Sequence, residues 1–272
     1  MQSILISGGN SGIGLHAARM FLALGYHVVL LGRDQRKGEE AIASFGSAAE
    51  RASFYSVDLS THDGVREAAA RVLADSDRFD VVLHTTGVLT SQEMRTADGL
   101  HPFFTVNYLS RYHLTQLLLP ALRHAEHPHV VMMTARVSPS TSVDLEMFPT
   151  FEPFSFSRAR KSIHVSNHHY AAHLARTEPG IRAGVVNAGA AKTDILRMSP
   201  WYMRASAKVV GPLLFNSVEE SAHNAVQASR VDYEPAAVYW DKPGDFERRT
   251  PIVVDEAVTR QIIDISRKLT GV

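Results

Sequence analysis

A glycine-rich turn close to the N-terminus constrains the fold of this chain more than any other feature. The turn follows the apolar run Ile4–Ser7 and precedes an amphipathic stretch. Glycines in this context allow a tight backbone turn and let phosphate oxygens reach main-chain N–H groups at a helix start. We therefore predict a strand, a pyrophosphate-binding turn and a helix. The residues expected around the pyrophosphate are Ser7, Gly8, Asn10, Ser11, Gly12, Ile13 and Gly14.

Short β-branched runs alternate with longer amphipathic stretches along the chain, as in proteins with parallel sheets. The runs predicted as strands are Ile4–Ser7, His27–Leu31, Ser53–Val57, Asp80–Leu83, His129–Thr134, Ile181–Val186 and Ala237–Trp240. Helices are predicted between them, for example at Gly12–Leu24, Thr61–Ala74, Leu100–Leu122 and Ser217–Ser229. We expect one α/β domain over residues 1–272, a Rossmann fold with a doubly wound, parallel, seven-stranded sheet and helices on both faces.

Composition narrows the possible functions. Lys plus Arg and Asp plus Glu both number 28, and this zero net charge argues against nucleic-acid binding. Cysteine is absent, which excludes disulfides, thiolate catalysis and cysteine-ligated metals. No apolar run approaches the roughly 20 residues of a membrane span, and from the first residues we expect no signal peptide. We expect a cytoplasmic enzyme.

Two irregular segments, 137–156 and 195–216, each follow the carboxyl end of a predicted strand. Both contain prolines and clustered aromatic residues. Open α/β sheets bind their ligands at the carboxyl ends of the strands. We predict that these two segments form the walls of a pocket for an apolar small molecule.

The end of the second predicted strand indicates which dinucleotide is bound. NAD-binding Rossmann proteins place a carboxylate there for the ribose 2′-OH, whereas Arg favours the 2′-phosphate of NADP. This chain has Arg33 at that point, with Asp34 one position later. We predict NADP(H), with Arg33 as the phosphate ligand. Arg36 and Lys37 follow closely, and at least one of them is expected on the solvated face of the next helix.

The glycine turn resembles the Thr-Gly-x-x-x-Gly-Ile-Gly turn of the short-chain dehydrogenase/reductase family, with Ser7 in place of the Thr. Residues 32–41 and the C-terminal residues 255–272 resemble the retinol-dehydrogenase and protochlorophyllide-reductase branch. The resemblance implies further cofactor contacts and a helix-borne catalytic Asn, and it extends over the whole chain. The residues so implied are Asp58 and Leu59 at the adenine, Gly87 after the fourth strand, Asn107 as the catalytic Asn, and Thr193 at the nicotinamide carboxamide.

The chain departs from that family at all three residues of its Ser-Tyr-Lys proton relay. Ala135 falls at the Ser position, with Thr134 beside it. Counting without gaps puts Arg160 at the Tyr position and His164 at the Lys position. A rival register puts Phe156 and Arg160 there, but it needs four extra residues inside the helix. In neither register does a Tyr precede a Lys by four residues.

The replacement residues still offer chemistry. Arg160 and His164 lie one helical turn apart and share a face. A guanidinium can stabilise an oxyanion or bind a carboxylate, and a His can bind hydroxyls or transfer a proton. We predict Asn107, Thr134, Arg160 and His164 as the catalytic set, with His164 also contacting the cofactor. The alternatives are a surface ion pair for Arg160, a packing role for His164 and a strand end at Thr134.

The histidines do not predict a metal site. His164/His168 and His169/His173 have the spacing of helical ligand pairs, but no third ligand is evident and we expect no metal.

We expect NADP(H)-dependent reduction of a C=O, C=N or activated C=C bond in an apolar small molecule. The alternatives are a redox-neutral cyclase, isomerase or dehydratase on the same fold, and a non-catalytic NADP-binding protein. Analogy with the family suggests a homodimer or homotetramer.

Overall fold

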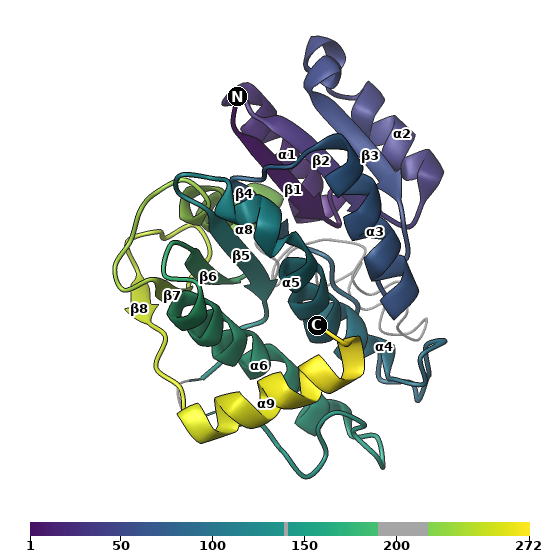
Figure 1. Cartoon of the computed structure of the whole chain (residues 1–272), viewed down its shortest axis with the longest axis vertical. Coiled ribbons are helices and arrows are strands. Elements are labelled where there is room, and N and C mark those ends of the chain that lie inside the picture. Colours follow the sequence, from purple (N-terminus) through teal and green to yellow (C-terminus); the bar gives the residue numbers. More distant parts are fainter. Residues whose placement is uncertain (139–140, 190–216) are drawn as a thin grey trace.

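A computed structural model describes residues 1–138, 141–189 and 217–272. Within these ranges, eight strands form one twisted sheet in the order β3-β2-β1-β4-β5-β6-β7-β8 (Figure 1). The first seven are parallel, which confirms the predicted Rossmann fold. Their bounds are β1 Ser3–Ser7, β2 His27–Gly32, β3 Ala52–Ser56, β4 Val81–His84, β5 His129–Thr134, β6 Arg182–Asn187 and β7 Ala237–Trp240.

The predicted count of seven strands was wrong by one, because a short strand β8, Arg249–Pro251, pairs antiparallel with β7. All three of its residues are exposed, so no apolar alternation marks it in the sequence. Proline is tolerated there because an edge strand leaves one side unpaired. Such a strand can be identified only from its pairing with β7, because its own sequence carries no strand pattern.

Helices cover both faces of the sheet because alternate residues of each strand point to opposite sides. Ile4 and Ile6 pack into the cluster under α1 and α8, whereas Leu5 packs into the cluster under α3, α5 and α6. The helices near the cofactor end are α1 Gly12–Ala23, α2 Gln35–Ala43, the 3₁₀ turn η1 Gly46–Arg51 and α3 His62–Asp75. The others are α4 Pro102–Phe104, α5 Ser110–Arg123, α6 Phe156–Thr177, α8 Val218–Ala228 and α9 Glu256–Thr270.

The long helix predicted at Leu100–Leu122 is divided in the structure. A π-helical turn, η2 Thr105–Leu109, separates α4 from α5. Helical periodicity continues through such a turn, so the sequence pattern does not reveal it. Single π turns are frequent at functional sites, and this one contains Asn107.

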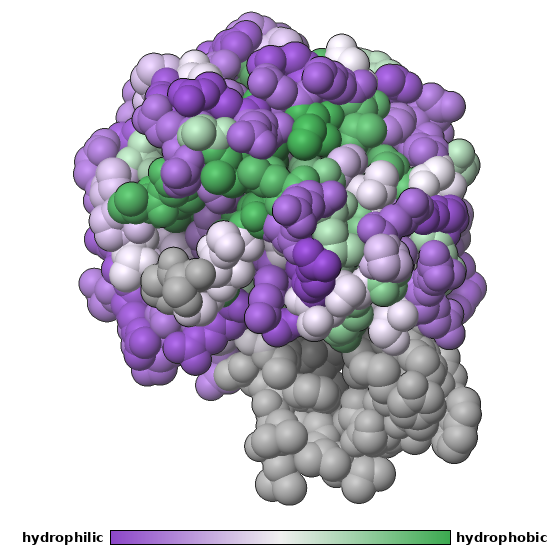
Figure 2. Space-filling view, turned by 90° about the horizontal axis from the view of Figure 1, so that it is seen from below, coloured by the Kyte–Doolittle hydropathy of each residue, from purple (hydrophilic) through white to green (hydrophobic). Residues whose placement is uncertain are grey.

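The segment after β5 contributes to the core as well as to the surface. Phe148 and Phe151 are buried, and both pack against Phe104 of α4. This segment and α9 lie at the bottom of Figure 1. Seen from below, that side shows a continuous hydrophobic strip bordered by hydrophilic side chains (Figure 2).

Candidate active site

The turn between β1 and α1 leaves no space for side chains at two of its glycines. Gly8 has a φ of +78°, and a Cβ there would lie 2.9 Å from the Thr86 backbone nitrogen. A Cβ on Gly14 would lie 2.4 Å from the carbonyl oxygen of Gly8. Ser11 precedes α1 without a side-chain capping bond. The first N–H groups of α1, including those of Ile13 and Gly14, therefore remain donors for an anion.

The charged residues that follow β2 have different contacts. The Asp34 carboxylate caps α2 by accepting a hydrogen bond from the Lys37 backbone N–H at 3.0 Å. Arg36 forms an ion pair with Glu40 one turn later. Arg33 is exposed and forms no ion pair within the described ranges. The Asn10 side chain lies against Gly32 and donates to the Asp34 carbonyl at 3.3 Å.

The loops after β3 and β4 contain the next predicted cofactor residues. Asp58 is exposed and its carboxylate accepts from the Ser60 N–H at 3.0 Å, while Leu59 is buried. Gly87 lies in the half-buried loop after β4. The neighbouring Thr85 hydroxyl donates to the Ser7 carbonyl at 2.6 Å, which ties this loop to the glycine turn.

Asn107 uses its side chain to hold the backbone around it. Its amide nitrogen donates to the carbonyls of Phe103 at 2.8 Å and Val88 at 3.0 Å. Its amide oxygen accepts from the Val88 N–H at 3.2 Å. The Asn107 carbonyl in turn accepts from Asn167 on α6 at 3.2 Å. Its position therefore links the loop after β4 with α4 and α6.

His164 lies on α6 where this helix crosses the end of β5. The Ala135 N–H points at its Nδ1 at 3.4 Å, and the Phe103 ring lies edge-on at 5.8 Å. Burial, together with the positive charges of Arg111 and Arg160, lowers the pKa of His164 to about 3. His164 is therefore neutral near pH 7. With Nδ1 facing a donor, its ring proton belongs on Nε2.

The other predicted reaction residues are only partly brought together. Arg160 is exposed and lines a small pocket that also includes His164. Thr134 is buried, and its hydroxyl donates to the Ala135 carbonyl at 3.0 Å, away from the pocket lining. Phe156 begins α6 and packs on Phe103 at 5.5 Å. Thr193 and the predicted loop 195–216 lie outside the described residues.

Arg111 is a further charged residue at this end, and the sequence analysis did not identify it. It is 3% exposed. Its guanidinium donates to the Asn167 amide oxygen at 3.1 Å and to the Thr86 carbonyl at 2.9 Å. Its Nε has no partner among the described residues. Burial lowers the pKa of Arg111 to about 9, so it stays protonated at neutral pH.

A sequence signal for Arg111 exists in retrospect. It lies four residues after Asn107, in a stretch from Phe103 to Leu122 that is otherwise mainly apolar. A helix that is apolar all round is buried, so a cation within it is buried too. No carboxylate forms an ion pair with it in the part of the chain that the structure describes.

Two further histidines of α6, His168 and His169, contact neighbouring side chains. His168 lies edge-on to Tyr239 with ring centroids 4.6 Å apart, and burial lowers its pKa to about 4. His169 Nδ1 lies 2.8 Å from the Thr259 hydroxyl. Within the described ranges, no group of three or more potential metal ligands occurs.

The parallel doubly wound sheet and the glycine turn at the start of α1 define a dinucleotide-binding protein of the Rossmann class. Residues 2–200 match the family model for short chain dehydrogenases, and the chain belongs to this family. The family and its named relatives place the chain among the oxidoreductases that use a nicotinamide cofactor.

Two human relatives represent the similarity. The chain is 24% identical to retinol dehydrogenase 14 of Homo sapiens over 290 aligned positions, covering 99% of this chain and 86% of that protein. It is 25% identical to polyprenol dehydrogenase of Homo sapiens over 235 positions, covering 83% and 71%. These relatives support the retinol-dehydrogenase-like branch.

A solved structure shows the same fold. It is 3-ketoacyl-(acyl-carrier-protein) reductase from Brucella melitensis complexed with NADH. The TM-score is 0.66 at 19% identity, over 90% of this chain and 98% of that one. Separately, none of the described helices has the length and hydropathy needed to cross a membrane.

Proposed function

We propose that this protein is an NADP(H)-dependent oxidoreductase that reduces a C=O, C=N or activated C=C bond of an apolar small molecule without the Ser-Tyr-Lys relay. The observation that carries the proposal is that neutral, buried His164 and the cation Arg160, one helical turn apart on α6, line the same small pocket beside the end of β5. This arrangement can stabilise negative charge at a reacting atom while offering no ordinary proton donor.

The residues present fit a dinucleotide. A Cβ on Gly8 would meet the Thr86 nitrogen and one on Gly14 the Gly8 carbonyl oxygen, so glycine at both positions allows the tight turn that a pyrophosphate-binding site requires. The first N–H groups of α1 receive no side-chain cap from Ser11 and can donate to an anion. Arg33 favours a 2′-phosphate because Asp34, the competing carboxylate, is already used as the α2 cap. NADP(H), when bound, supplies or accepts the hydride.

The side chains at the reaction end support charge stabilisation. Arg160 and the buried Arg111 place two positive charges near His164. Their field favours negative charge that develops on a substrate oxygen, and the His164 Nε2–H is a further donor. His164 does not itself titrate near pH 7, so the final proton comes from solvent. An iminium carbon needs no proton at all, because its nitrogen already carries the charge.

Aromatic side chains support an apolar substrate. Phe103 contacts both Phe156 and His164, at ring distances of 5.5 and 5.8 Å. Phe154 and Phe156 are only half-buried. Side chains of this kind provide an apolar wall beside the polar groups, which is the common composition of small-molecule sites.

The test is NADPH oxidation with a panel of apolar ketones, enones and cyclic iminium ions. We expect turnover with at least one class, and a loss of roughly 100-fold in kcat for Arg160→Gln or His164→Phe. Arg176→Gln is the matched control, because Arg176 is on the same helix and pairs with Glu256 at the surface. Product formation without a change in the cofactor would instead identify a redox-neutral enzyme. Turnover that survives both substitutions would remove the assigned roles.

A further inference from the structure

A small pocket beside His164 has an unusual charge balance. Its lining residues are Arg136, Val137, Thr141, Arg160, Lys161 and His164. Three of them are cations and none is an acid. Burial keeps His164 neutral, so the positive charge comes from the two arginines and the lysine.

A neighbouring cation outside this pocket, Arg158, has a carboxylate partner. Arg158, two residues before Arg160 on α6, donates from Nε to the Asp144 carboxylate at 2.6 Å. Arg160 and Lys161 form no ion pair within the part of the chain that the structure describes. The contrast lies within one turn of a helix, so exposure alone does not explain it.

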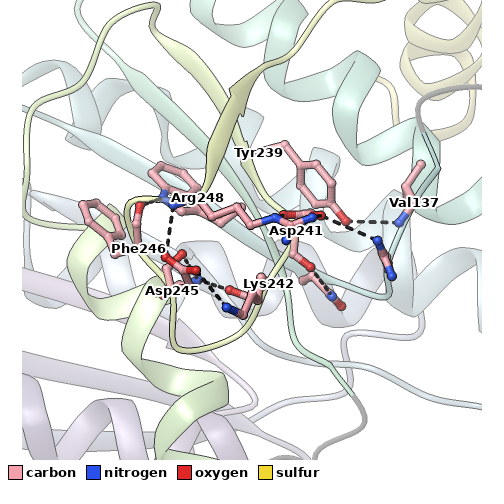
Figure 3. A network of polar contacts seen from close by, with 11 residues as sticks. Val137, Tyr239, Asp241, Lys242, Asp245, Phe246 and Arg248 are labelled. Carbon is pink, nitrogen blue, oxygen red and sulfur yellow. Dashed lines mark hydrogen bonds and ion pairs between the residues drawn. The ribbon is translucent and has the colours of Figure 1, made fainter.

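The one carboxylate near Arg136 among the described residues also contacts a second arginine. Asp241 lies 3.8 Å from its guanidinium, but Asp241 accepts two shorter hydrogen bonds from Arg248, at 2.8 and 3.0 Å. Figure 3 shows Asp241 directed at Arg248, close to the contact between the Tyr239 hydroxyl and the Val137 backbone. The charge of Asp241 is thus largely used by Arg248.

The two segments outside the described residues offer few acids for these cations. Residues 139–140 are Pro-Ser and carry no charge. Residues 190–216 contain a single acid, Asp194, against the bases Lys192, Arg197, Arg204 and Lys208. At most one further carboxylate can therefore come from these segments.

We propose that this pocket binds an anionic group, a carboxylate or a phosphate, carried by the substrate. The identity of the ligand as a substrate rests on the function proposed above. An arginine fork binds either group through two parallel hydrogen bonds, and a lysine adds a point charge. The anion also relieves the mutual repulsion of three cations in a small space. The reacting carbon then lies beside Arg160 and His164, and the apolar body contacts the phenylalanines.

Binding measurements separate this inference from turnover. The probes are phenylglyoxylate, its neutral methyl ester and phenyl phosphate, titrated calorimetrically into protein saturated with NADP⁺. We expect phenylglyoxylate or phenyl phosphate to bind at least tenfold more tightly than the ester, which corresponds to one charge-assisted hydrogen bond. Which anion binds more tightly identifies the carboxylate or the phosphate as the preferred group.

The double variant Arg160→Gln/Lys161→Gln should bring the ratio of acid to ester affinity close to one. The control Arg176→Gln removes one positive charge from the same helix, away from the pocket, and should leave this ratio unchanged. Equal binding of acid and ester by the unchanged protein, or a ratio that survives the double substitution, would overturn the inference. Anion selectivity without NADPH oxidation by any substrate would confirm the anion site and remove both the proposed reductase and the identity of the anion as its substrate.

Discussion

At the cofactor end the backbone shapes the site, whereas at the reaction end side chains from separate elements do so. The glycine turn depends on the close approach of main-chain atoms at Gly8 and Gly14. The reaction end depends on Arg111 of α5, Asn167 and His164 of α6, and the backbone after β5. A backbone site changes only when its few glycines change. A side-chain site can change its chemistry by single substitutions, and this difference explains how one fold carries many reactions.

The two ends also differ in how charge is handled. Near the glycine turn the charged residues are exposed and serve as caps or surface pairs, as Asp34 and Arg36 do. The helices of the reaction end bury a guanidinium that forms no ion pair with any described residue, together with neutral histidines. Buried histidines are tolerated only while they stay unprotonated, because a buried charge costs free energy. We therefore expect acid to destabilise the reaction end first.

The largest expected effect is a loss of stability in acid. Burial lowers the pKa of five histidines to about 3 or 4: His84, His113, His164, His168 and His169. Below pH 6.5 the unfolded chain binds protons at these residues and the folded protein does not, so stability falls as pH falls. Together they change the free energy of unfolding by roughly 5 kcal/mol per pH unit. Urea unfolding at pH 7.5, 6 and 5 measures this slope.

His169→Gln sharpens that test, because His169 contacts Thr259 rather than either end of the site. The variant should lower the number of protons taken up on unfolding by nearly one. A stability that stays flat from pH 7.5 to 5 would show that these histidines are not neutral and buried.

The next effect tests the backbone end. Gly14→Ala puts a Cβ 2.4 Å from the Gly8 carbonyl oxygen, so the turn must shift. Overpacking of this kind costs about 1–3 kcal/mol, and we expect NADPH affinity to fall about 100-fold. Fluorescence titration of NADPH measures it. Gly180→Ala is the control, since no atom lies within 4 Å of its added Cβ. Equal NADPH affinity in both variants would mean that the turn does not hold the cofactor.

The contrast between the two ends also explains what the sequence could predict. The sheet and the glycine turn follow from local patterns, because a strand or a tight turn is specified by adjacent residues. Three-residue β8 and the π turn at Asn107 leave no periodic signal of their own. Arg111 appears in the sequence as one more helical arginine, since its burial depends on α6 packing over it. The contact between Ala135 and His164 likewise needs two elements in place.

A smaller effect is expected from Arg111→Met at the reaction end. Removing a buried cation that has no carboxylate partner in the described ranges offsets the loss of its hydrogen bonds to Asn167 and Thr86, so we expect little change in thermal stability. Turnover should fall roughly 30-fold, because Arg111 positions Asn167 and supplies part of the positive field. The pKa of His164 should rise as a neighbouring charge is lost, which NMR of the imidazole resonances detects. An unchanged His164 titration together with full activity would contradict this role.

The smallest effect returns to the cofactor end, at the one place where a side chain rather than the backbone is expected to choose the ligand. Arg33 is exposed at the end of β2, and its neighbour Asp34 is held as the α2 cap. In Arg33→Gln we expect NADPH to bind about tenfold more weakly, because one charge-assisted contact to the 2′-phosphate is lost. NADH affinity should not change, since NADH lacks that phosphate.

Arg36→Gln is the matched control for Arg33→Gln. Arg36 carries the same charge on the following turn but already pairs with Glu40, so its loss should alter the NADPH to NADH ratio less than twofold. The expected tenfold change should also shrink at high salt, because an exposed contact to phosphate is screened. If the unchanged protein binds NADH as tightly as NADPH, Arg33 is a surface residue. The cofactor end would then be a backbone site throughout.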